Sequence, residues 1–178
     1  GSNYLEQMAH LDTVVSDKTG TLTEGVFHVT QVVPAEGVSK EAVLRNAAIV
    51  ESLSTHPIAK SIQAAYTEVL EPGLARDARN ISGQGLIAKV GDSTVCVGNK
   101  RLMEENEIGY REIQDGESTV VYVAADGKFL GAIIISDEIK DSAVKAIREM
   151  KQEGVLHVEM TTGDRKGIAE AVAKKLSV

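Results

Sequence analysis

A short β-branched run leads straight into an aspartate, and this junction constrains the fold of the chain more than any other stretch. Thr13-Val14-Val15 precedes the sequence Asp17-Lys18-Thr19-Gly20-Thr21-Leu22-Thr23. The apolar run predicts a buried strand of the parallel type. Asp17 then lies at the carboxyl end of that strand, which is where open α/β sheets bind their ligands. A carboxylate there can act as a nucleophile, and the small residues after it can turn backbone N–H groups towards a phosphoryl group.

Composition excludes several classes of protein. The chain has 178 residues, enough for one domain or two small ones, and 43% of them are hydrophobic. A net charge of −7 argues against a nucleic-acid partner, which needs a basic face. The single cysteine, Cys96, rules out an intrachain disulfide and a Cys-x-x-Cys metal site. Because no apolar run approaches the roughly 20 residues of a membrane helix, we expect a soluble chain exposed to the cytosol.

The hydrophobic period changes twice along the chain, from helical to strand-like and back. Helices are expected over residues 39–53, 57–69, 99–106 and 141–153 and in a last segment that includes Ile168, Val172 and Leu176. Strands are expected over residues 24–33, 86–90, 93–97, 120–125, 128–135 and 155–160, with Gly91-Asp92 and Asp126-Gly127 as hairpin turns. The pattern therefore predicts an α/β domain interrupted by an α+β insertion.

Three short motifs in the insertion are individually weak. Glu51 and His56 flank the break between two helices, where a capping or solvated histidine is the usual explanation. Gly83-Gln84-Gly85 leads into a strand, so it is a tight turn and no dinucleotide fingerprint. Gly98-Asn99 has the form of a helix N-cap.

Two further motifs lie after the insertion. Thr162-Gly163-Asp164 ends one strand and opens a helix, where backbone N–H groups favour an anion. Asp164 is also an ordinary N-cap residue. Asp137 to Lys140, at the return from the insertion, has a surface charge pair as its simplest explanation.

The Asp17 motif closely resembles the phosphorylation motif of the P-type ATPases, whose aspartate accepts the terminal phosphoryl group of ATP. The same strand and aspartate occur in the haloacid-dehalogenase-like superfamily, whose soluble phosphatases carry a second aspartate two residues later. Thr19 occupies that position here. Without that general base a phospho-aspartate is hydrolysed slowly, which favours an ATPase over a phosphatase.

The order of the remaining motifs resembles the heavy-metal-transporting P-type ATPases, with the zinc/cadmium type looking closest. That family carries a Glu, a Ser-x-His-Pro, a Gly-x-Gly and a Gly-Asn in its nucleotide-binding domain. The resemblance implies that Glu51, His56, Gly83, Gly85 and Asn99 line an ATP site. It also implies hinges near Thr23–Gly25 and Ser136–Lys140, the second of which includes the family's Asp-x-x-Lys segment.

The same resemblance implies a phosphorylation site and a Mg²⁺ site. The residues that it assigns to catalysis, beside the acceptor Asp17, are Lys18, Thr19, Thr162, Gly163 and Asp164. Mg²⁺ is expected between Asp17, the Thr19 carbonyl and the phosphate.

The fold implied is a partial haloacid-dehalogenase-like (Rossmann-like) α/β phosphorylation domain, interrupted by an α+β nucleotide-binding domain with an antiparallel sheet and a helical pair. The expected bounds are residues 3–23 and 135–178 for the first and 24–134 for the second. The cofactors are ATP and Mg²⁺. In the full-length pump the partners are an actuator domain, transmembrane domains and the transported metal ion, and this region lies on the cytoplasmic face of the membrane.

Some alternatives stay open. The family's Gly-Asp-Gly-x-Asn-Asp motif, which helps to hold Mg²⁺, would lie beyond Val178, so the chain is expected to bind ATP and to autophosphorylate poorly or not at all. A soluble phosphatase of the same superfamily and a non-catalytic nucleotide-binding module are the other candidates. The transported ion cannot be read from this sequence, because the ion ligands of such pumps lie in membrane helices.

Overall fold

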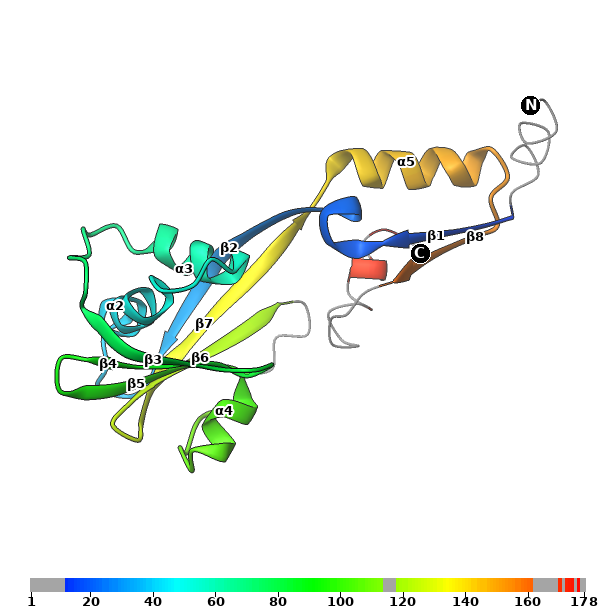
Figure 1. Cartoon of the computed structure of the whole chain (residues 1–178). Coiled ribbons are helices and arrows are strands. Elements are labelled where there is room, and N and C mark those ends of the chain that lie inside the picture. The colour runs from blue at the N-terminus through cyan, green and yellow to red at the C-terminus, as the bar shows by residue number, and fades with distance from the viewer. Residues whose placement is uncertain (1–11, 114–117, 162–169, 171, 175, 177–178) are drawn as a thin grey trace. The chain divides into compact units, whose positions relative to one another are not determined.

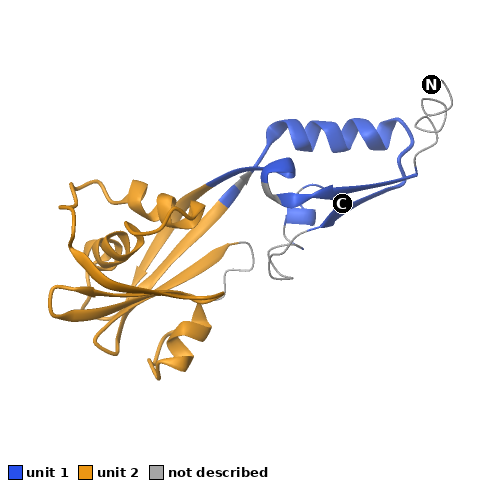
Figure 2. Ribbon diagram, in the orientation of Figure 1, with its two compact units in different colours: residues 1–26, 137–178 blue, residues 27–136 orange. Residues whose placement is uncertain are grey.

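The chain forms two compact units, which are described separately (Figure 2). The computed structural model describes residues 12–113, 118–161, 170, 172–174 and 176. Unit 1 combines residues 1–26 with residues 137–178, and unit 2 is the continuous segment 27–136.

Unit 2 is built on an antiparallel sheet. In the described residues the strand order is β2-β7-β6-β5-β4-β3, and every pair from β3 to β7 is antiparallel. The strands are β2 (Thr23–Pro34), β3 (Ala75–Ile81), β4 (Gly85–Val90), β5 (Ser93–Gly98), β6 (Thr119–Ala125) and β7 (Lys128–Ile139). Both hairpins predicted from the sequence are confirmed. At the β6–β7 turn Asp126 and Gly127 have φ of 48° and 75°. A favoured two-residue hairpin turn requires such positive φ values at both central residues.

Helices cover both faces of this sheet (Figure 1). One face carries α2 (Lys40–Glu51) and α3 (Pro57–Ala65), and the other carries α4 (Lys100–Glu105). The Ser39 hydroxyl accepts the Ala42 N–H at 3.0 Å and so begins α2, as predicted. Two hydrophobic clusters result, one between α2 and the sheet and one between α4 and the sheet.

The second predicted helix, over residues 57–69, is wrong at its C-terminal end. The helix ends at Ala65, and Tyr66 has an extended backbone with φ −89° and ψ 113°. The Tyr66 hydroxyl donates to the Glu68 carboxylate at 2.9 Å just after the helix end. Val69 is 96% exposed and contributes nothing to the core.

Unit 1 contains a parallel strand pair. Its elements are β1 (Thr13–Asp17), the single π-helical turn η1 (Lys18–Leu22), α5 (Asp141–Gln152) and β8 (His157–Thr161). β1 and β8 run parallel, with Val14 beside Val158 and Asp17 beside Thr161. Ala143 and Ile147 of α5 pack with Val158, so α5 covers one face of the pair.

The prediction that the first strand is buried is wrong. No residue of β1 is buried, and Val15 is 58% exposed. Parallel strands become fully buried only when helices cover both faces. Among the described residues α5 covers the Val158 face, and the side chain of Val15 alternates to the other face.

No helix in the described part of the chain is long and apolar enough to cross a membrane.

Candidate functional site

Asp17 lies where β1 ends and η1 begins, as the sequence predicts. Its register partner in β8 is Thr161, whose hydroxyl donates to the Ser16 carbonyl at 3.4 Å. Asp17 is exposed, whereas the next residue, Lys18, is 3% exposed and interacts with the protein around it. The expected partners Thr162, Gly163 and Asp164 lie outside the described residues, so their predicted role stays a prediction.

The loop after Asp17 is anchored by Thr23, which is completely buried. The Thr23 hydroxyl donates to Oδ2 of Asp137 at 2.5 Å and lies 3.2 Å from the carbonyl oxygen of Lys18. The Gly20 N–H in turn donates to Oγ1 of Thr23 at 3.3 Å. Gly20 has φ of 77°, which lets the backbone turn back towards this hydroxyl.

Lys140 anchors the same loop from the other side. Its ammonium group donates to the Gly20 carbonyl at 2.6 Å, and its N–H donates to the Leu22 carbonyl at 3.0 Å. Asp137 and Lys140 therefore bind the Asp17 loop, and the explanation as a surface charge pair is wrong. Oδ1 of Asp137 is buried and has no hydrogen-bond partner among the described residues.

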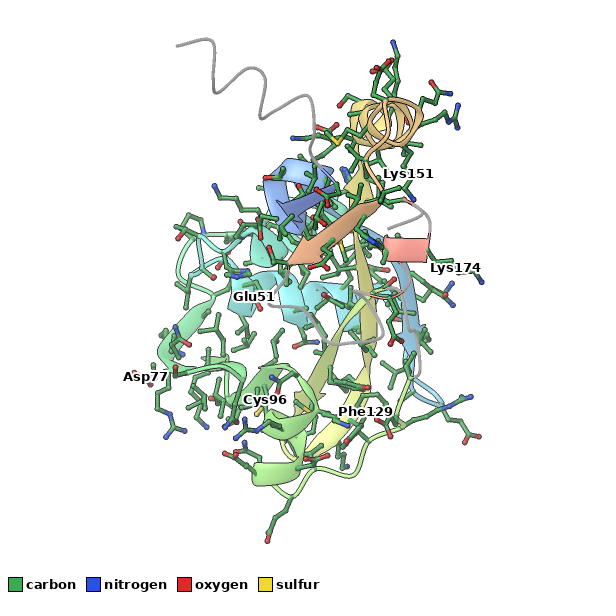
Figure 3. All side chains as sticks on the ribbon, turned by 90° about the vertical axis from the view of Figure 1, so that its right-hand side faces the viewer. Glu51, Asp77, Cys96, Phe129, Lys151 and Lys174 are labelled. Atoms are coloured by element: carbon green, nitrogen blue, oxygen red, sulfur yellow. The ribbon has the colours of Figure 1, made fainter. Side chains whose placement is uncertain are left out.

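Glu51 is a buried acid at the C-terminal end of α2 (Figure 3). Its backbone carbonyl accepts two hydrogen bonds, one from Nε2 of Gln63 at 2.5 Å and one from the Ser54 N–H at 2.9 Å. These two bonds fix the turn into α3. Burial raises the pKa of the Glu51 carboxyl group to about 7.

His56 is exposed and caps α3. Its Nδ1 accepts the Ile58 N–H at 3.2 Å, and Pro57 occupies the first position of the helix. Because Nδ1 acts as an acceptor, the neutral imidazole carries its proton on Nε2. The exposed side chain therefore offers an N–H donor to a ligand while its other nitrogen stays bound to the helix.

Gly83 and Asn99 lie together in one hydrogen-bonded corner. The Asn99 amide donates from Nδ2 to the Gly83 carbonyl at 2.8 Å, and its Oδ1 accepts the Leu102 N–H at 3.3 Å. The Asn99 N–H donates to the Gln84 carbonyl at 2.8 Å. Asn99 thus begins α4, as predicted, and also fixes the turn that carries Gly83.

Gly85 joins this corner because two strands approach closely there. It is the register partner of Gly98, and a Cβ atom on Gly85 would lie 2.2 Å from the Val97 carbonyl oxygen. A Cβ atom on Gly98 would likewise lie 2.2 Å from the Gln84 carbonyl oxygen. Strand packing alone explains both glycines. Sequence reasoning assigned Gly85 to a ligand and did not foresee this contact.

The predicted nucleotide residues form two groups on connected elements. Gly83, Gly85 and Asn99 belong to the corner at the ends of β4 and β5, and α2, which ends in Glu51, packs on both strands. His56 follows in the turn from α2 to α3. Among the described residues no hydrogen bond joins the Glu51–His56 group to the glycine corner.

The structure also has two shallow grooves near the β3 edge of unit 2, of about 410 Å³ and 280 Å³. Asp77 and Lys89 line both of them, and none of the predicted nucleotide residues does. Asp77 lies at a bulge of β3 with φ of 52°. These grooves are distinct from the Glu51–His56 turn and from the glycine corner.

Within the described residues no group of three His, Cys, Asp or Glu side chains could hold a metal ion. In the described part of the chain, β1 ends at Asp17, whose carboxylate belongs to no such group of three. A cation there therefore needs further ligands from water or from a bound anion.

Comparison with known proteins assigns these features to one family. A sequence profile described as hydrolase, haloacid dehalogenase-like hydrolase, matches residues 11–178. The "Cadmium, zinc and cobalt-transporting ATPase" of Bacillus subtilis (strain 168) is 44% identical over 179 residues, which cover 100% of this chain and 25% of that protein. The chain thus spans about a quarter of the length of this relative.

Solved structures agree with the sequence relatives. A zinc-transporting PIB-type ATPase in the E2.Pi state superposes with a TM-score of 0.73 at 33% identity, covering 100% of this chain and 30% of that chain. The catalytic domain of the CPx-ATPase CopB-B, described in connection with its conformational changes upon nucleotide binding, superposes with a TM-score of 0.71 at 28% identity. It covers 100% of this chain and 64% of that chain.

Proposed function

We propose that this chain, which belongs to the haloacid dehalogenase-like hydrolase family and is homologous to the catalytic region of heavy-metal-transporting P-type ATPases, binds ATP and accepts its terminal phosphoryl group on Asp17. The observation that carries the proposal is the placement of Asp17, which is exposed at the end of a parallel strand and followed by a tightly anchored loop. Ligands of open α/β sheets bind at this edge.

The chemistry on Asp17 is a phosphoryl transfer. A carboxylate oxygen of Asp17 forms a bond to the γ-phosphorus, and the bond from that phosphorus to the β,γ-bridging oxygen breaks, so that ADP leaves. The contacts of Thr23, Asp137 and Lys140 are with one another and with the loop after Asp17. They hold the Gly20 backbone, and so the loop, in one conformation.

Lys18, Thr19, Thr162, Gly163 and Asp164 remain proposed members of the same site. Lys18 follows the acceptor directly in the sequence and is buried, and its charge would stabilise the transferred group. Position 19 is a threonine, so the chain lacks the second aspartate of the soluble phosphatases there.

The residues at the end of β1 fit a magnesium ion. Mg²⁺ commonly binds one or two carboxylates together with substrate phosphates and several waters. Asp17 would supply a carboxylate and Thr19 a backbone carbonyl. When bound, the ion neutralises charge on the phosphoryl oxygens.

Unit 2 is the proposed nucleotide-binding domain. His56 presents an exposed Nε2–H donor. Gly83 is exposed in the corner of Gly83, Gly85 and Asn99, which lies at the ends of β4 and β5, the strands against which α2 packs. Donors of this kind suit the phosphates and ribose of ATP. The α2–α3 turn and the glycine corner would therefore bind different parts of one nucleotide.

The role of the whole protein follows by homology. The chain would be the ATP-binding and phosphorylation region of a heavy-metal cation pump, on the cytoplasmic face of the membrane, working with an actuator domain and transmembrane domains. The relative from Bacillus subtilis is named for cadmium, zinc and cobalt, which favours an ion of this group.

An ATP titration of the ¹⁵N-labelled chain tests nucleotide binding. Amide shifts should concentrate at His56, Gly83, Gly85 and Asn99, and Asp17→Asn should leave them unchanged because the acceptor lies in the other unit. Release of phosphate from small phosphoesters without any ATP-dependent shift would instead support a soluble phosphatase. ATP-dependent shifts confined to the β3–β4 grooves would overturn the assignment of the site.

A further inference from the structure

The bulge in β3 brings two arginines onto one face of the sheet. Arg76 is the register partner of Lys89, and Arg79 is the register partner of Ile87, so β3 has one residue more than β4 between these two pairs. Because side chains alternate along a strand, residues three apart in a regular strand point to opposite faces. The extra residue of the bulge puts both arginines on the same face.

This face is the one on which α4 lies. Ile87 pairs with Cys96 and Lys89 with Thr94, and both Ile87 and Cys96 belong to the cluster between α4 and the sheet. Burial raises the pKa of the Cys96 thiol, and the positive charge of Arg79 acts in the opposite direction, as expected for a side chain on the same face. Lys89 and the two arginines therefore share one face of unit 2.

Like charges lie directly opposite each other at Arg76 and Lys89. Such a cross-strand pair destabilises a sheet. Among the described residues neither of these side chains, nor that of Arg79, forms an ion pair or a hydrogen bond, although the net charge of the chain is −7. The fold thus keeps three unpaired cations together at a cost that the packing of the sheet does not explain.

The larger of the two grooves near the β3 edge, of about 410 Å³, lies at these side chains. Arg79 and Lys89 line it together with Thr94, whose hydroxyl takes part in no hydrogen bond within the described part of the chain. Its apolar lining comes from Ile87 and Ala88, which are both buried. A groove of this volume accommodates a small organic molecule.

Acidic side chains also lie near this groove. Asp77 lines both grooves, and Asp92 lines the smaller one, of about 280 Å³. Neither carboxylate forms an ion pair with a described residue. Asp126, whose pKa is lowered mainly by the hydrogen bond from the Thr94 N–H, lines neither groove. Two cations and one acid therefore line the larger groove, which leaves it with a positive charge.

A phosphate monoester has the chemistry that these groups would bind. Its charge approaches −2, the Arg79 guanidinium presents a planar fork that matches phosphate oxygens, and Lys89 adds a point charge. The Thr94 hydroxyl can donate to another phosphate oxygen. The carbon atoms of the ligand would pack on Ile87. A bound anion would also offset the repulsion between the like charges of β3 and β4.

We propose that the groove on the α4 side of β3 and β4 is a second ligand site of unit 2, which binds a phosphate monoester through Arg79, Lys89 and Thr94. The residues proposed to bind ATP lie elsewhere, at the α2–α3 turn and in the glycine corner. The second site does not depend on the proposed function, because none of its residues takes part in that function. A soluble small molecule and a lipid headgroup can both supply a phosphate monoester.

A titration of the ¹⁵N-labelled chain with sn-glycerol 3-phosphate tests the site, without ATP and at an ionic strength held constant with sodium chloride. Saturable amide shifts should concentrate at Arg79, Lys89 and Thr94. Arg79→Gln should weaken the affinity about tenfold, the typical contribution of one hydrogen bond between charged groups. Arg79 is exposed, so this substitution leaves the core intact.

Lys40→Gln is the matched control. It also removes one exposed positive charge from unit 2, but Lys40 lies at the start of α2, on the other face of the sheet. The dissociation constant should not change in this variant. An equal loss of affinity in Arg79→Gln and Lys40→Gln would show a general charge effect and overturn the proposal. Absence of saturable shifts, or shifts confined to His56 and the glycine corner, would overturn it as well.

A second measurement uses the like-charged pair. Arg76→Gln should raise the melting temperature in phosphate-free buffer, because it removes the repulsion with Lys89. Glycerol 3-phosphate should then stabilise this variant less than the wild type. A lower melting temperature of Arg76→Gln without ligand would contradict the unneutralised pair on which the proposal rests.

Vesicles distinguish the two sources of the phosphate. The chain is sedimented with phosphatidylcholine vesicles that contain phosphatidic acid. Co-sedimentation that is lost in Arg79→Gln and kept in Lys40→Gln would support the site and identify a lipid headgroup as its ligand. Binding of glycerol 3-phosphate without co-sedimentation would support the site and identify a soluble ligand.

Discussion

At the scale of single residues, the contact between Thr23 and Asp137 helps to anchor the Asp17 loop. The two residues are 114 positions apart, yet a buried hydroxyl meets a carboxylate oxygen at 2.5 Å. A buried carboxylate that loses its donor pays the desolvation penalty of an unsatisfied group. Among the described residues the second oxygen of Asp137 is buried without a hydrogen-bond partner, so the carboxylate depends on Thr23.

We expect Thr23→Val and Asp137→Asn to be strongly coupled. Thr23→Val keeps the shape of the side chain and removes the hydroxyl, which should destabilise unit 1 by about 1–3 kcal/mol. In the Asp137→Asn background the same substitution should cost much less, because no charged acceptor is left unpaired. Hydrogen exchange of the β1 amides in the four variants measures the coupling.

Thr30→Val is the matched control for this cycle. The Thr30 hydroxyl also donates a hydrogen bond, to the Ile134 carbonyl at 3.2 Å, but its partner is in unit 2. It should show no coupling to Asp137→Asn. Additive effects of Thr23→Val and Asp137→Asn would mean that this contact does not hold the loop.

At the scale of elements, the corner formed by β4, β5 and α4 explains why Gly-x-Gly and Gly-Asn occur together. Gly85 faces Gly98 across the strand pair, and the Asn99 amide ties the preceding turn to the start of α4. These contacts stabilise the corner whether or not a nucleotide is bound. A loss of ATP binding after substitution at Gly85 would therefore have two sources, a disrupted corner and a lost contact with the nucleotide. The two must be measured separately.

Gly85→Ala should unfold or strongly destabilise unit 2, because its Cβ would lie 2.2 Å from the Val97 carbonyl oxygen and 2.5 Å from the Gly98 Cα atom. Gly83→Ala meets no atom within 4 Å and costs only the strain of a φ of 68°, about 1 kcal/mol. Thermal unfolding of the two variants measures the difference. Equal melting temperatures would contradict the close approach of β4 and β5.

Much of unit 2 can be predicted from the sequence because its turns carry strong local signals. Asp126-Gly127, Pro57 and Asn99 each specify a local backbone geometry, and the structure has the expected hairpin, helix start and cap there. β3 was missed because it is an edge strand. Ala75 is its one buried residue, and the charged residues that follow show no alternation of apolar and polar positions.

The contacts of the Asp17 loop could not be predicted in this way. The motif itself identified Asp17, but Thr23, Asp137 and Lys140 meet only in the folded unit. Periodicity reports on neighbours along the chain and not on contacts between distant segments. For the same reason, the burial of Glu51 could not be predicted. In the sequence it is only an acidic residue at the end of a predicted helix.

At the scale of the whole molecule, the proposed acceptor and the proposed nucleotide site belong to different units. Asp17 belongs to unit 1, which contains both ends of the chain, and the nucleotide residues belong to the continuous unit 2. The chain enters unit 2 through β2 and leaves it through β7, and these two strands are neighbours in the sheet. Under the proposed function, phosphorylation requires a group bound by one unit to react with a residue of the other.

The central claim, that Asp17 accepts a phosphoryl group, is tested most directly by trapping the product. The chain is incubated with Mg²⁺ and either ATP or acetyl phosphate, reduced with borohydride, which converts an aspartyl phosphate to homoserine, and mapped by mass spectrometry. We predict homoserine at position 17, at low occupancy with ATP and higher with acetyl phosphate, and none in Asp17→Asn. Homoserine at another position, an unchanged yield in Asp17→Asn, or no homoserine with either donor in the folded chain would contradict the account.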